Sequence, residues 1–296
     1  MQKQGSARAR SGLALQSGEF AIGKDLPVAR LGFGAMRITG KGIWGEPANR
    51  RDAIRVLRRA VELGVNFIDT ADSYGPSVSE EIIAEALHPY PAGLVIATKA
   101  GFDRPGPDQW VENGRPEHLK SACEGSLRRL RLDRIDLFQL HRIDPKVPAA
   151  DQLGALKELQ AQGKIKHIGL SEVNAGQIAN AQKLVPIVSV QNRYSLTDRE
   201  SENVLEYCER NEIGFIPWFP LAAGRLSATD GAIGKVATRL KATPSQVALA
   251  WLLARSPVML PIPGTSSVDH LEENLRAAEL KIDPGSLKEL EGLARG

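Results

Sequence analysis

Residues 53–69 read AIRVLRRAVELGVNFID, and this stretch carries the pattern on which the fold prediction depends. Its first half places apolar side chains at helical spacing, namely Ile54, Val56, Leu57, Ala60 and Val61. The helix is expected to end at Gly64, which is a C-cap signal, and the apolar strand that follows directly ends in Asp69. A helix that leads through a glycine into an apolar strand is the repeating unit of parallel α/β proteins.

The same alternation continues on both sides of this unit. Downstream, a helical segment followed by an extended segment recurs six times. The pairs are residues 80–87 and 94–99, 116–130 and 135–140, 150–162 and 165–170, 175–184 and 187–191, 200–210 and 213–218, and 244–254 and 258–262. A last pair of helices closes the chain. Upstream, residues 20–30 predict a β-hairpin with a turn at residues 23–25, and residues 31–34 predict the first strand of the alternation.

Eight strands joined by helices, with no shift in composition between them, predict a single (β/α)8 TIM barrel with an N-terminal β-hairpin and extra C-terminal helices. The rival fold is an open doubly wound sheet. It is disfavoured because no glycine-rich dinucleotide fingerprint follows any strand; residues 32–36, GFGAM, lack the third glycine. We expect the barrel domain to span residues 18–296, and residues 1–17, which contain no acidic residue, to form a mobile tail.

The charge balance of this 296-residue chain argues against two classes of partner. Its 38 basic and 35 acidic residues are well mixed and leave a formal net charge of +3, which favours neither nucleic acid nor a membrane surface. The one basic cluster, at residues 128–134, is interrupted by Asp133 and lies where a helix is expected to end, so we interpret it as a solvated helix C-terminus. The longest strongly apolar run, residues 247–254, is far shorter than the roughly 18 residues of a membrane span.

The cysteine content indicates a reducing compartment. Only Cys123 and Cys208 occur, and their wide separation is neither a disulfide framework nor a zinc-site spacing. We therefore expect a cytoplasmic protein without a metal site. The oligomeric state stays open.

Polar residues mark the ends of several expected strands. Asp69 ends the second strand, Tyr74 lies in the loop after it, Lys99 ends the third strand and His141 follows the fourth. In a (β/α)8 barrel the C-terminal ends of the strands converge on one mouth. An aspartate, a tyrosine, a lysine and a histidine gathered there can perform acid–base chemistry on a carbonyl group.

Each of these residue types suits one role. A tyrosine donates a proton near neutral pH when its phenol pKa of about 10 is lowered, and a nearby Lys99 cation is expected to lower the pKa of Tyr74. Asp69 would supply the counter-charge that a buried ammonium needs, and His141 would orient a carbonyl oxygen toward Tyr74. Taken one at a time, Asp69 would more often be a loop carboxylate, Tyr74 a packing aromatic, Lys99 a solvated strand end and His141 a structural histidine.

At these positions the sequence resembles the aldo-keto reductase superfamily, from about Phe20 to the C-terminus. The matching motifs are GVNFIDTADSYG at 64–75, ATK at 97–99, LH at 140–141, KHIGLS at 166–171, VQN at 190–192 and PIPGT at 261–265. The resemblance implies NADPH-dependent carbonyl reduction on a barrel that binds the dinucleotide without the missing fingerprint. It also implies that the catalytic residues are Asp69, Tyr74, Lys99 and His141.

A cofactor site is implied by the same resemblance. Trp218 would stack on the nicotinamide ring, Ser171 and Gln191 would bind its carboxamide, and the adenosine phosphate would lie at the start of a helix near residue 268. The full set of implied cofactor-binding positions is Met36, Ser171, Gln191, Trp218, Phe219, Leu221, Gly224, Leu226, Gly264, Thr265, Ser266, Ser267, His270, Glu273 and Asn274.

Three positions depart from the family pattern. Glu172 stands where asparagine is usual, Gly264 where many relatives have lysine, and His270 where many have arginine. The last two differences remove the strongest cations for the 2′-phosphate of NADPH. We still expect NADPH, because the hydroxyls of residues 265–267 precede a helix N-terminus, and NADH stays open as the alternative.

Within the superfamily, residues 42–47, 218–221 and 263–274 look most like bacterial pyridoxal reductases. The expected partner is therefore a small-molecule carbonyl substrate, and the candidate residues for its pocket are Trp44, Phe102, Trp110 and Arg142. Two other functions stay open. One is a cofactor-binding, non-enzymatic regulatory subunit of the same fold, and the other is a barrel enzyme that forms a Schiff base on Lys99.

Overall fold

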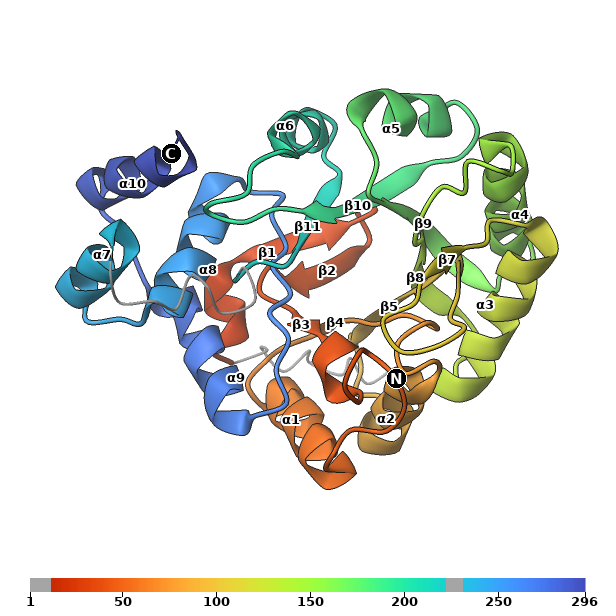
Figure 1. Ribbon diagram of the computed structural model, residues 1–296, viewed down its shortest axis with the longest axis horizontal. Coiled ribbons are helices and arrows are strands. Elements are labelled where there is room, and N and C mark those ends of the chain that lie inside the picture. Colours follow the sequence, from red (N-terminus) through yellow and green to blue (C-terminus); the bar gives the residue numbers. More distant parts are fainter. Residues whose placement is uncertain (1–11, 222–230, 296) are drawn as a thin grey trace, which may run out of the picture.

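The computed structural model of the protein describes residues 12–221 and 231–295 (Figure 1). Its centre is a parallel sheet of seven strands in the order β11-β10-β9-β8-β5-β4-β3. The strands are β3 Phe33–Gly34, β4 Phe67–Asp69, β5 Val95–Ala100, β8 Ile135–Leu140, β9 Ile165–Ser171, β10 Ile187–Arg193 and β11 Gly214–Trp218. Most of their side chains are buried on both faces, as expected of a parallel sheet that helices cover.

Helices α1 to α6, α8 and α9 surround this sheet in Figure 1. The helices are α1 Arg50–Glu62, α2 Val78–Leu87, α3 Pro116–Leu130, α4 Ala149–Ala161, α5 Ala175–Gln182, α6 Glu202–Arg210, α7 Ala232–Leu240, α8 Pro244–Arg255, α9 Val268–Leu275 and α10 Pro284–Glu291. Asn49, Asn174 and Thr243 each begin a helix by accepting a hydrogen bond from its first turn. Among the described residues, none of the helices has the length and apolar character needed to cross a membrane.

The barrel closes through residues 258–262, which we expected to form a regular eighth strand. This segment makes only two backbone hydrogen bonds of 2.8 Å to Phe215 on one side, and Pro261 O accepts from Gly32 N at 2.9 Å on the other. Pro261 and Pro263 have no N–H to donate, so a continuous ladder cannot form here. The (β/α)8 barrel is confirmed, with the correction that its eighth segment is a bridge between β11 and β3.

Other differences from the prediction lie in the connections. The loop after β5 contains a second hairpin, β6 Phe102–Asp103 and β7 Val111–Glu112, which the sequence analysis did not identify. Helix α7 was also missed, and α2 begins at Val78, two residues before its expected start. Strands β6 and β7 are too short to leave a periodic signal in the sequence.

The N-terminal segment packs earlier than the expected boundary at residue 18. Residues Ala14–Ser17 form a short 3-10 helix, in which Ala14 N donates to Leu63 O at 3.0 Å and Ser17 Oγ accepts from Leu31 N at 2.9 Å. These residues therefore belong to the packing of the barrel and not to a tail. The rest of the expected tail, residues 1–11, lies outside the described residues.

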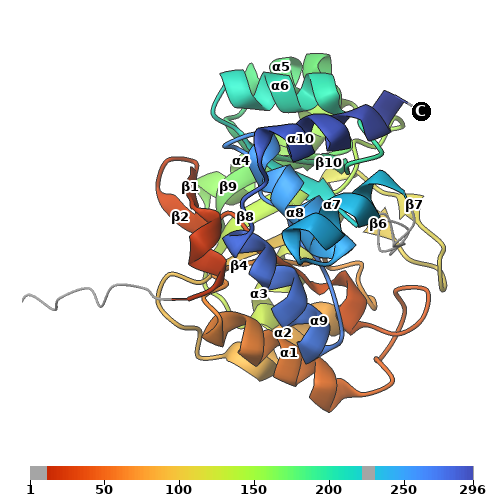
Figure 2. The ribbon, with the colours of Figure 1, turned by 90° about the vertical axis from the view of Figure 1, so that its left-hand side faces the viewer.

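The predicted N-terminal hairpin closes one end of the barrel. Strands β1 Glu19–Ile22 and β2 Leu26–Ala29 pair antiparallel, and they contribute to a buried cluster of Ile22, Leu26, Val28, Phe67, Val95, Ala97, Leu137, Ile216, Leu260 and Ile262. Figure 2 shows this hairpin on one side of the molecule and the β6–β7 hairpin on the opposite side. The end at which the strands begin is therefore plugged, and the end at which they finish is available for a site.

Asn66 ties the hairpin to the barrel. This side chain is 8% exposed; its Oδ1 accepts from Ala29 N at 2.7 Å, and its Nδ2 donates to Pro27 O at 2.9 Å and to Gly93 O at 3.2 Å. One amide thus satisfies two backbone groups of β2 and one of the loop before β5, which is how buried polar groups are stabilised.

We expect Asn66→Ala to lower the free energy of unfolding by about 1–3 kcal/mol, because it leaves the buried Ala29 N–H without a partner. Asn211→Ala is the matched control, since Asn211 is exposed and, among the described residues, its side chain donates only to Tyr207 O, at 2.8 Å. Its effect should stay within about 0.5 kcal/mol. Urea unfolding followed by circular dichroism measures both variants, and equal losses would contradict the role given to Asn66.

Candidate active site

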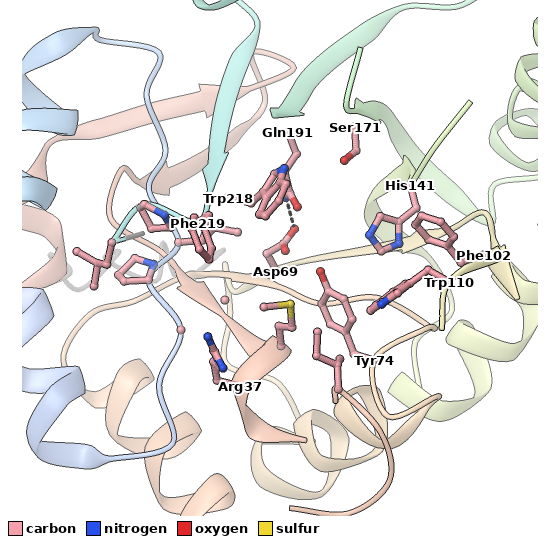
Figure 3. Close-up of a pocket in the computed structure, with 18 of the residues that line it drawn as sticks. Arg37, Asp69, Tyr74, Phe102, Trp110, His141, Ser171, Gln191, Trp218 and Phe219 are labelled. Atoms are coloured by element: carbon pink, nitrogen blue, oxygen red, sulfur yellow. Dashed lines mark hydrogen bonds between the residues drawn. The ribbon is translucent and has the colours of Figure 1, made fainter. Parts of the chain in front are cut away.

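A cavity of about 540 Å³ opens at the end of the barrel where the strands finish (Figure 3). Asp69, Ser171 and Trp218 line it, and they are the last residues of β4, β9 and β11. The other lining residues are Gly34, Met36, Arg37, Ile43, Tyr74, Phe102, Trp110, His141, Arg142, Gln191, Phe219, Pro220, Leu221, Ile262, Pro263 and Gly264. As expected, polar residues at or just after the strand ends, among them Asp69, Tyr74 and His141, converge on this cavity.

The floor of the cavity is a buried ion pair. Lys99 Nζ donates to Asp69 Oδ1 at 2.6 Å and to Thr70 O at 2.7 Å, and the two charged side chains are 0% and 2% exposed. Asp69 Oδ2 accepts from Gln139 Nε2 at 3.0 Å and from Gln191 Nε2 at 2.9 Å. Both carboxylate oxygens are therefore satisfied, as a buried charge requires.

Lys99 is held in its charged form. Burial opposes the ammonium, but the neighbouring Asp69 and Tyr74 outweigh burial and raise the pKa of Lys99 above its ordinary value. A cation therefore stays fixed beneath the cavity at neutral pH.

Tyr74 lies above this cation, in the loop between β4 and α2. Its ring centroid is 5.1 Å from Lys99 Nζ, and the residue is 6% exposed. Burial raises the pKa of Tyr74, the charge of Lys99 lowers it and that of Asp69 raises it, and the net direction is upward. The expected lowering of the phenol pKa by Lys99 is thus present as a contribution, but the net direction in this ligand-free site is upward, because burial penalises the phenolate.

His141 forms the adjoining wall as an uncharged imidazole. Burial is the main cause of a pKa well below the usual value, and the positive charges of Lys99, Arg142 and Arg104 lower it further. Ser73 Oγ lies 3.3 Å from His141 Nδ1. A neutral imidazole keeps one ring N–H as a donor, so His141 can hydrogen-bond to a carbonyl oxygen without competing as an acid.

The β6–β7 hairpin supplies an aromatic wall. Phe102 and Trp110 pack edge-on against His141, with ring centroids at 4.8 and 6.1 Å, and Trp110 also packs against Tyr74 at 6.4 Å. Arg104 stacks 3.6 Å from the Trp110 centroid and donates to Ser73 O at 2.6 Å. Figure 3 shows this aromatic group on one side of Tyr74.

Trp218 and Phe219 form the opposite wall in Figure 3. Glu172, which departs from the family pattern, holds Trp218 in place: its Oε1 accepts from Trp218 Nε1 at 2.6 Å and from Arg193 N at 2.7 Å. Glu172 has a φ of 54°, a left-handed conformation that this double contact stabilises. Its carboxylate thus orients the indole that was expected to stack on a nicotinamide.

The two residues expected to bind a carboxamide line the cavity, each with a protein partner. Ser171 Oγ accepts from Arg142 Nη1 at 3.1 Å, and Gln191 donates to Asp69 as described above. The hydroxyl proton of Ser171 and the carbonyl oxygen of Gln191 can still pair with an amide.

Gly264 begins a segment that leads away from this cavity toward α9. A Cβ on Gly264 would lie 2.5 Å from Gly34 O, so the lysine that many relatives have at this position cannot fit without a backbone shift. Ser266 and Ser267 line a second cavity of about 690 Å³, opposite Asp52, Arg55, Arg58, Arg59 and Glu62 of α1. Ser267 begins α9, because its side chain accepts a hydrogen bond from His270 N. Thr265 and Asn274 are buried. Glu273 Oε1 accepts a hydrogen bond from Thr243 Oγ1.

Some predicted positions fall outside the main cavity. Trp44 does not line it and lies instead against Arg104, 5.7 Å from the guanidinium carbon. Thr265 lines neither cavity, Ser266 and Ser267 line the second one, and His270, Glu273 and Asn274 lie in α9. Gly224 and Leu226 lie outside the described residues.

Sequence reasoning missed four polar side chains of the site. Gln139 had a detectable signal, because it is a polar residue inside an otherwise apolar strand end. Arg37 also had a detectable signal, because it directly follows Met36, a predicted cofactor-binding position. Ser73 and Arg104 had none, since their roles arise from loops that meet only in the folded chain.

The comparisons with known proteins agree on one family. The model of the aldo/keto reductase family matches residues 30–295. An uncharacterized oxidoreductase of Schizosaccharomyces pombe is 52% identical over 91% of this chain and 87% of its own length, and pyridoxine 4-dehydrogenase of Escherichia coli is 44% identical over 95% and 100%. The crystal structure of an aldo/keto reductase from Klebsiella pneumoniae, solved in complex with NADP and acetate, superimposes with a TM-score of 0.79 at 26% identity, covering 93% of this chain and 94% of that one.

The family match thus spans nearly all of the barrel whose strand ends carry the Lys99–Asp69 pair, Tyr74 and His141. The chain belongs to the aldo/keto reductase family of oxidoreductases.

Proposed function

We propose that this protein reduces an aldehyde or ketone to an alcohol with NADPH as cofactor, a reaction of the EC 1.1.1 type, and that Tyr74 is the general acid. The observation that carries the proposal is the buried Lys99–Asp69 pair beneath Tyr74, with a neutral His141 beside it, at the floor of one cavity. This arrangement suits proton donation to a carbonyl oxygen.

The described residues fit a dinucleotide. Trp218 offers an aromatic face, and Ser171 and Gln191 offer amide partners on the cavity wall. Gly264 lines the main cavity, and the chain continues from it to Ser266 and Ser267, which line the second cavity and precede α9. A helix N-terminus with hydroxyls stabilises a phosphate, and Arg55, Arg58 and Arg59 of α1 add cations to a cavity that also contains Asp52, Glu62 and Asp269.

Each catalytic side chain has one task. When bound, NADPH supplies the hydride that reduces the carbonyl carbon. Tyr74 gives its phenolic proton to the carbonyl oxygen, so that the alcohol leaves neutral and the phenolate regains a proton from water. Lys99 stabilises the phenolate, Asp69 keeps Lys99 charged, and His141 donates a hydrogen bond to the carbonyl oxygen.

We further propose pyridoxal, reduced to pyridoxine, as the substrate. Support comes from the 44% identity to pyridoxine 4-dehydrogenase and from the aromatic wall of Phe102 and Trp110, which suits a flat ring. The free, buried thiols of Cys123 and Cys208 support a cytoplasmic location.

The direct assay follows cofactor absorbance at 340 nm with pyridoxal and with a panel of other aldehydes and ketones. We expect NADPH to be oxidised with pyridoxal, and NADH to bind more weakly in a titration of tryptophan fluorescence. Tighter binding of NADH would contradict the cofactor preference. Binding of NADPH without turnover of any carbonyl would instead favour the regulatory-subunit alternative.

Tyr74→Phe should lower turnover by about 10²–10⁴, the range that general acid catalysis typically contributes. Its affinity for NADPH should be nearly unchanged, because the phenol acts on the substrate oxygen. Tyr207→Phe is the matched control, since the Tyr207 hydroxyl donates to Gln182 on the outer helices, at 2.7 Å. Near-normal turnover in Tyr74→Phe would show that another group is the acid.

Lys99→Met should abolish most reduction and shift the pH dependence of the reverse reaction. Alcohol oxidation needs the phenolate, so it rises as pH passes through the pKa of Tyr74, and removing the cation that lowers this pKa moves the rise to higher pH. Lys99→Met leaves the buried Asp69 carboxylate without its counter-charge, which can prevent folding. In that case the double variant Lys99→Met/Asp69→Asn takes its place, because it removes both charges.

Borohydride treatment of the native enzyme with substrate separates this role of Lys99 from a Schiff base. We expect mass spectrometry to find no adduct. A trapped mass increment on Lys99 would overturn the proposed mechanism.

A further inference from the structure

Arg142 is a half-buried cation in the wall of the main cavity, directly after His141. Its Nη1 donates to His141 O at 2.6 Å and to Ser171 Oγ at 3.1 Å. Its guanidinium carbon lies 5.5 Å from the Phe102 centroid. The arginine is thus anchored by one nitrogen, between the general-acid side of the cavity and the aromatic wall.

The remaining donors of this guanidinium meet no acceptor in the part of the chain that the structure describes. Among residues 12–221 and 231–295, Nε and Nη2 of Arg142 form no hydrogen bond, and no carboxylate lies within 4 Å of its nitrogens. The nearby carboxylate of Glu172 is already held by Trp218 and the backbone of Arg193. A partly desolvated guanidinium with a free edge is stabilised by an anion that offers oxygens to it.

Among the described residues, the charged side chains that line the cavity outside the Lys99–Asp69 pair are cationic. Asp69 is the single acidic residue that lines the cavity among the described residues, and Lys99 neutralises it. Arg142 and Arg104 both contribute to the depression of the His141 pKa, so the reacting end of the cavity is electropositive. With a neutral substrate, the opposite charges that act on Arg142 would be those of Glu172 and Glu112, which lie beyond salt-bridge distance.

We propose that Arg142 selects carbonyl substrates that carry an anionic oxygen, a phenolate or a carboxylate, on an aromatic ring. The free edge of the guanidinium binds that anion while the ring packs on Phe102 and the carbonyl oxygen faces Tyr74 and His141. The inference rests on the proposed carbonyl reduction and extends it. Pyridoxal has this chemistry, because its ring hydroxyl is ionised at neutral pH.

The test uses two benzaldehydes of nearly the same shape, 3-carboxybenzaldehyde, which is anionic, and 3-formylbenzamide, which is neutral. We expect Arg142→Gln to lower kcat/KM for the anionic aldehyde by roughly 10- to 100-fold, the size of a lost charge-assisted hydrogen bond, and to leave the neutral aldehyde nearly unchanged. Arg142→Lys should restore a large part of the preference. Arg37→Gln is the matched control, because Arg37 lines the same cavity beside Gly264, and the ratio between the two aldehydes should not change.

An equal loss of kcat/KM for both aldehydes would overturn the proposal. It would show that Arg142 only holds His141 and Ser171 in position. A second measurement decides the matter without turnover: benzoate and benzamide binding, followed by tryptophan fluorescence, in the wild type and Arg142→Gln. Tighter binding of benzoate that disappears in the variant supports the proposal, and equal binding of both probes contradicts it. If no aldehyde is reduced but this binding preference holds, the proposed reaction fails while the anion site stands.

Discussion

The buried ion pair between Lys99 and Asp69 is the interaction on which the rest of the site depends. Removing two charges from water costs several kcal/mol for each ion, and only complete pairing offsets that cost. The partners come from four strands: Asp69 from β4, Lys99 from β5, Gln139 from β8 and Gln191 from β10. Since β4 and β10 are far apart in the order of the sheet, the contact between Asp69 and Gln191 requires the sheet to curl into a barrel. Closure of the fold and neutralisation of the pair therefore depend on each other.

The chemistry follows from how this pair acts on its neighbours. Burial alone would leave Tyr74 a very weak acid, and the cation below it offsets part of that penalty. The same cation helps to keep His141 uncharged. In the proposed reaction, Tyr74 is therefore the proton donor and His141 orients the carbonyl oxygen. One fixed positive charge thus separates the roles of two titratable residues, which is the usual way in which acid and base assignments arise in a site.

Sequence patterns predicted most of the barrel because each helix and strand carries its own period. They also predicted that Asp69, Tyr74 and His141 meet at one cavity, because strand ends converge. They were less successful where an outcome depends on tertiary contacts. The eighth segment has an apolar strand pattern, but its prolines allow only a bridge. The net direction of the Tyr74 pKa follows from burial, which no local pattern reports. Ser73 and Arg104 act through loops that meet only after folding. Trp44 lies against Arg104 and does not line the cavity.

The central claim is that these residues serve hydride transfer to a carbonyl carbon. Its most direct test supplies NADPH deuterated at both C4 positions, together with pyridoxal in ordinary water, and locates the label in the product by mass spectrometry and NMR. We expect one deuterium on the newly formed carbinol carbon and none released to water. An alcohol without deuterium at that carbon would contradict the claim.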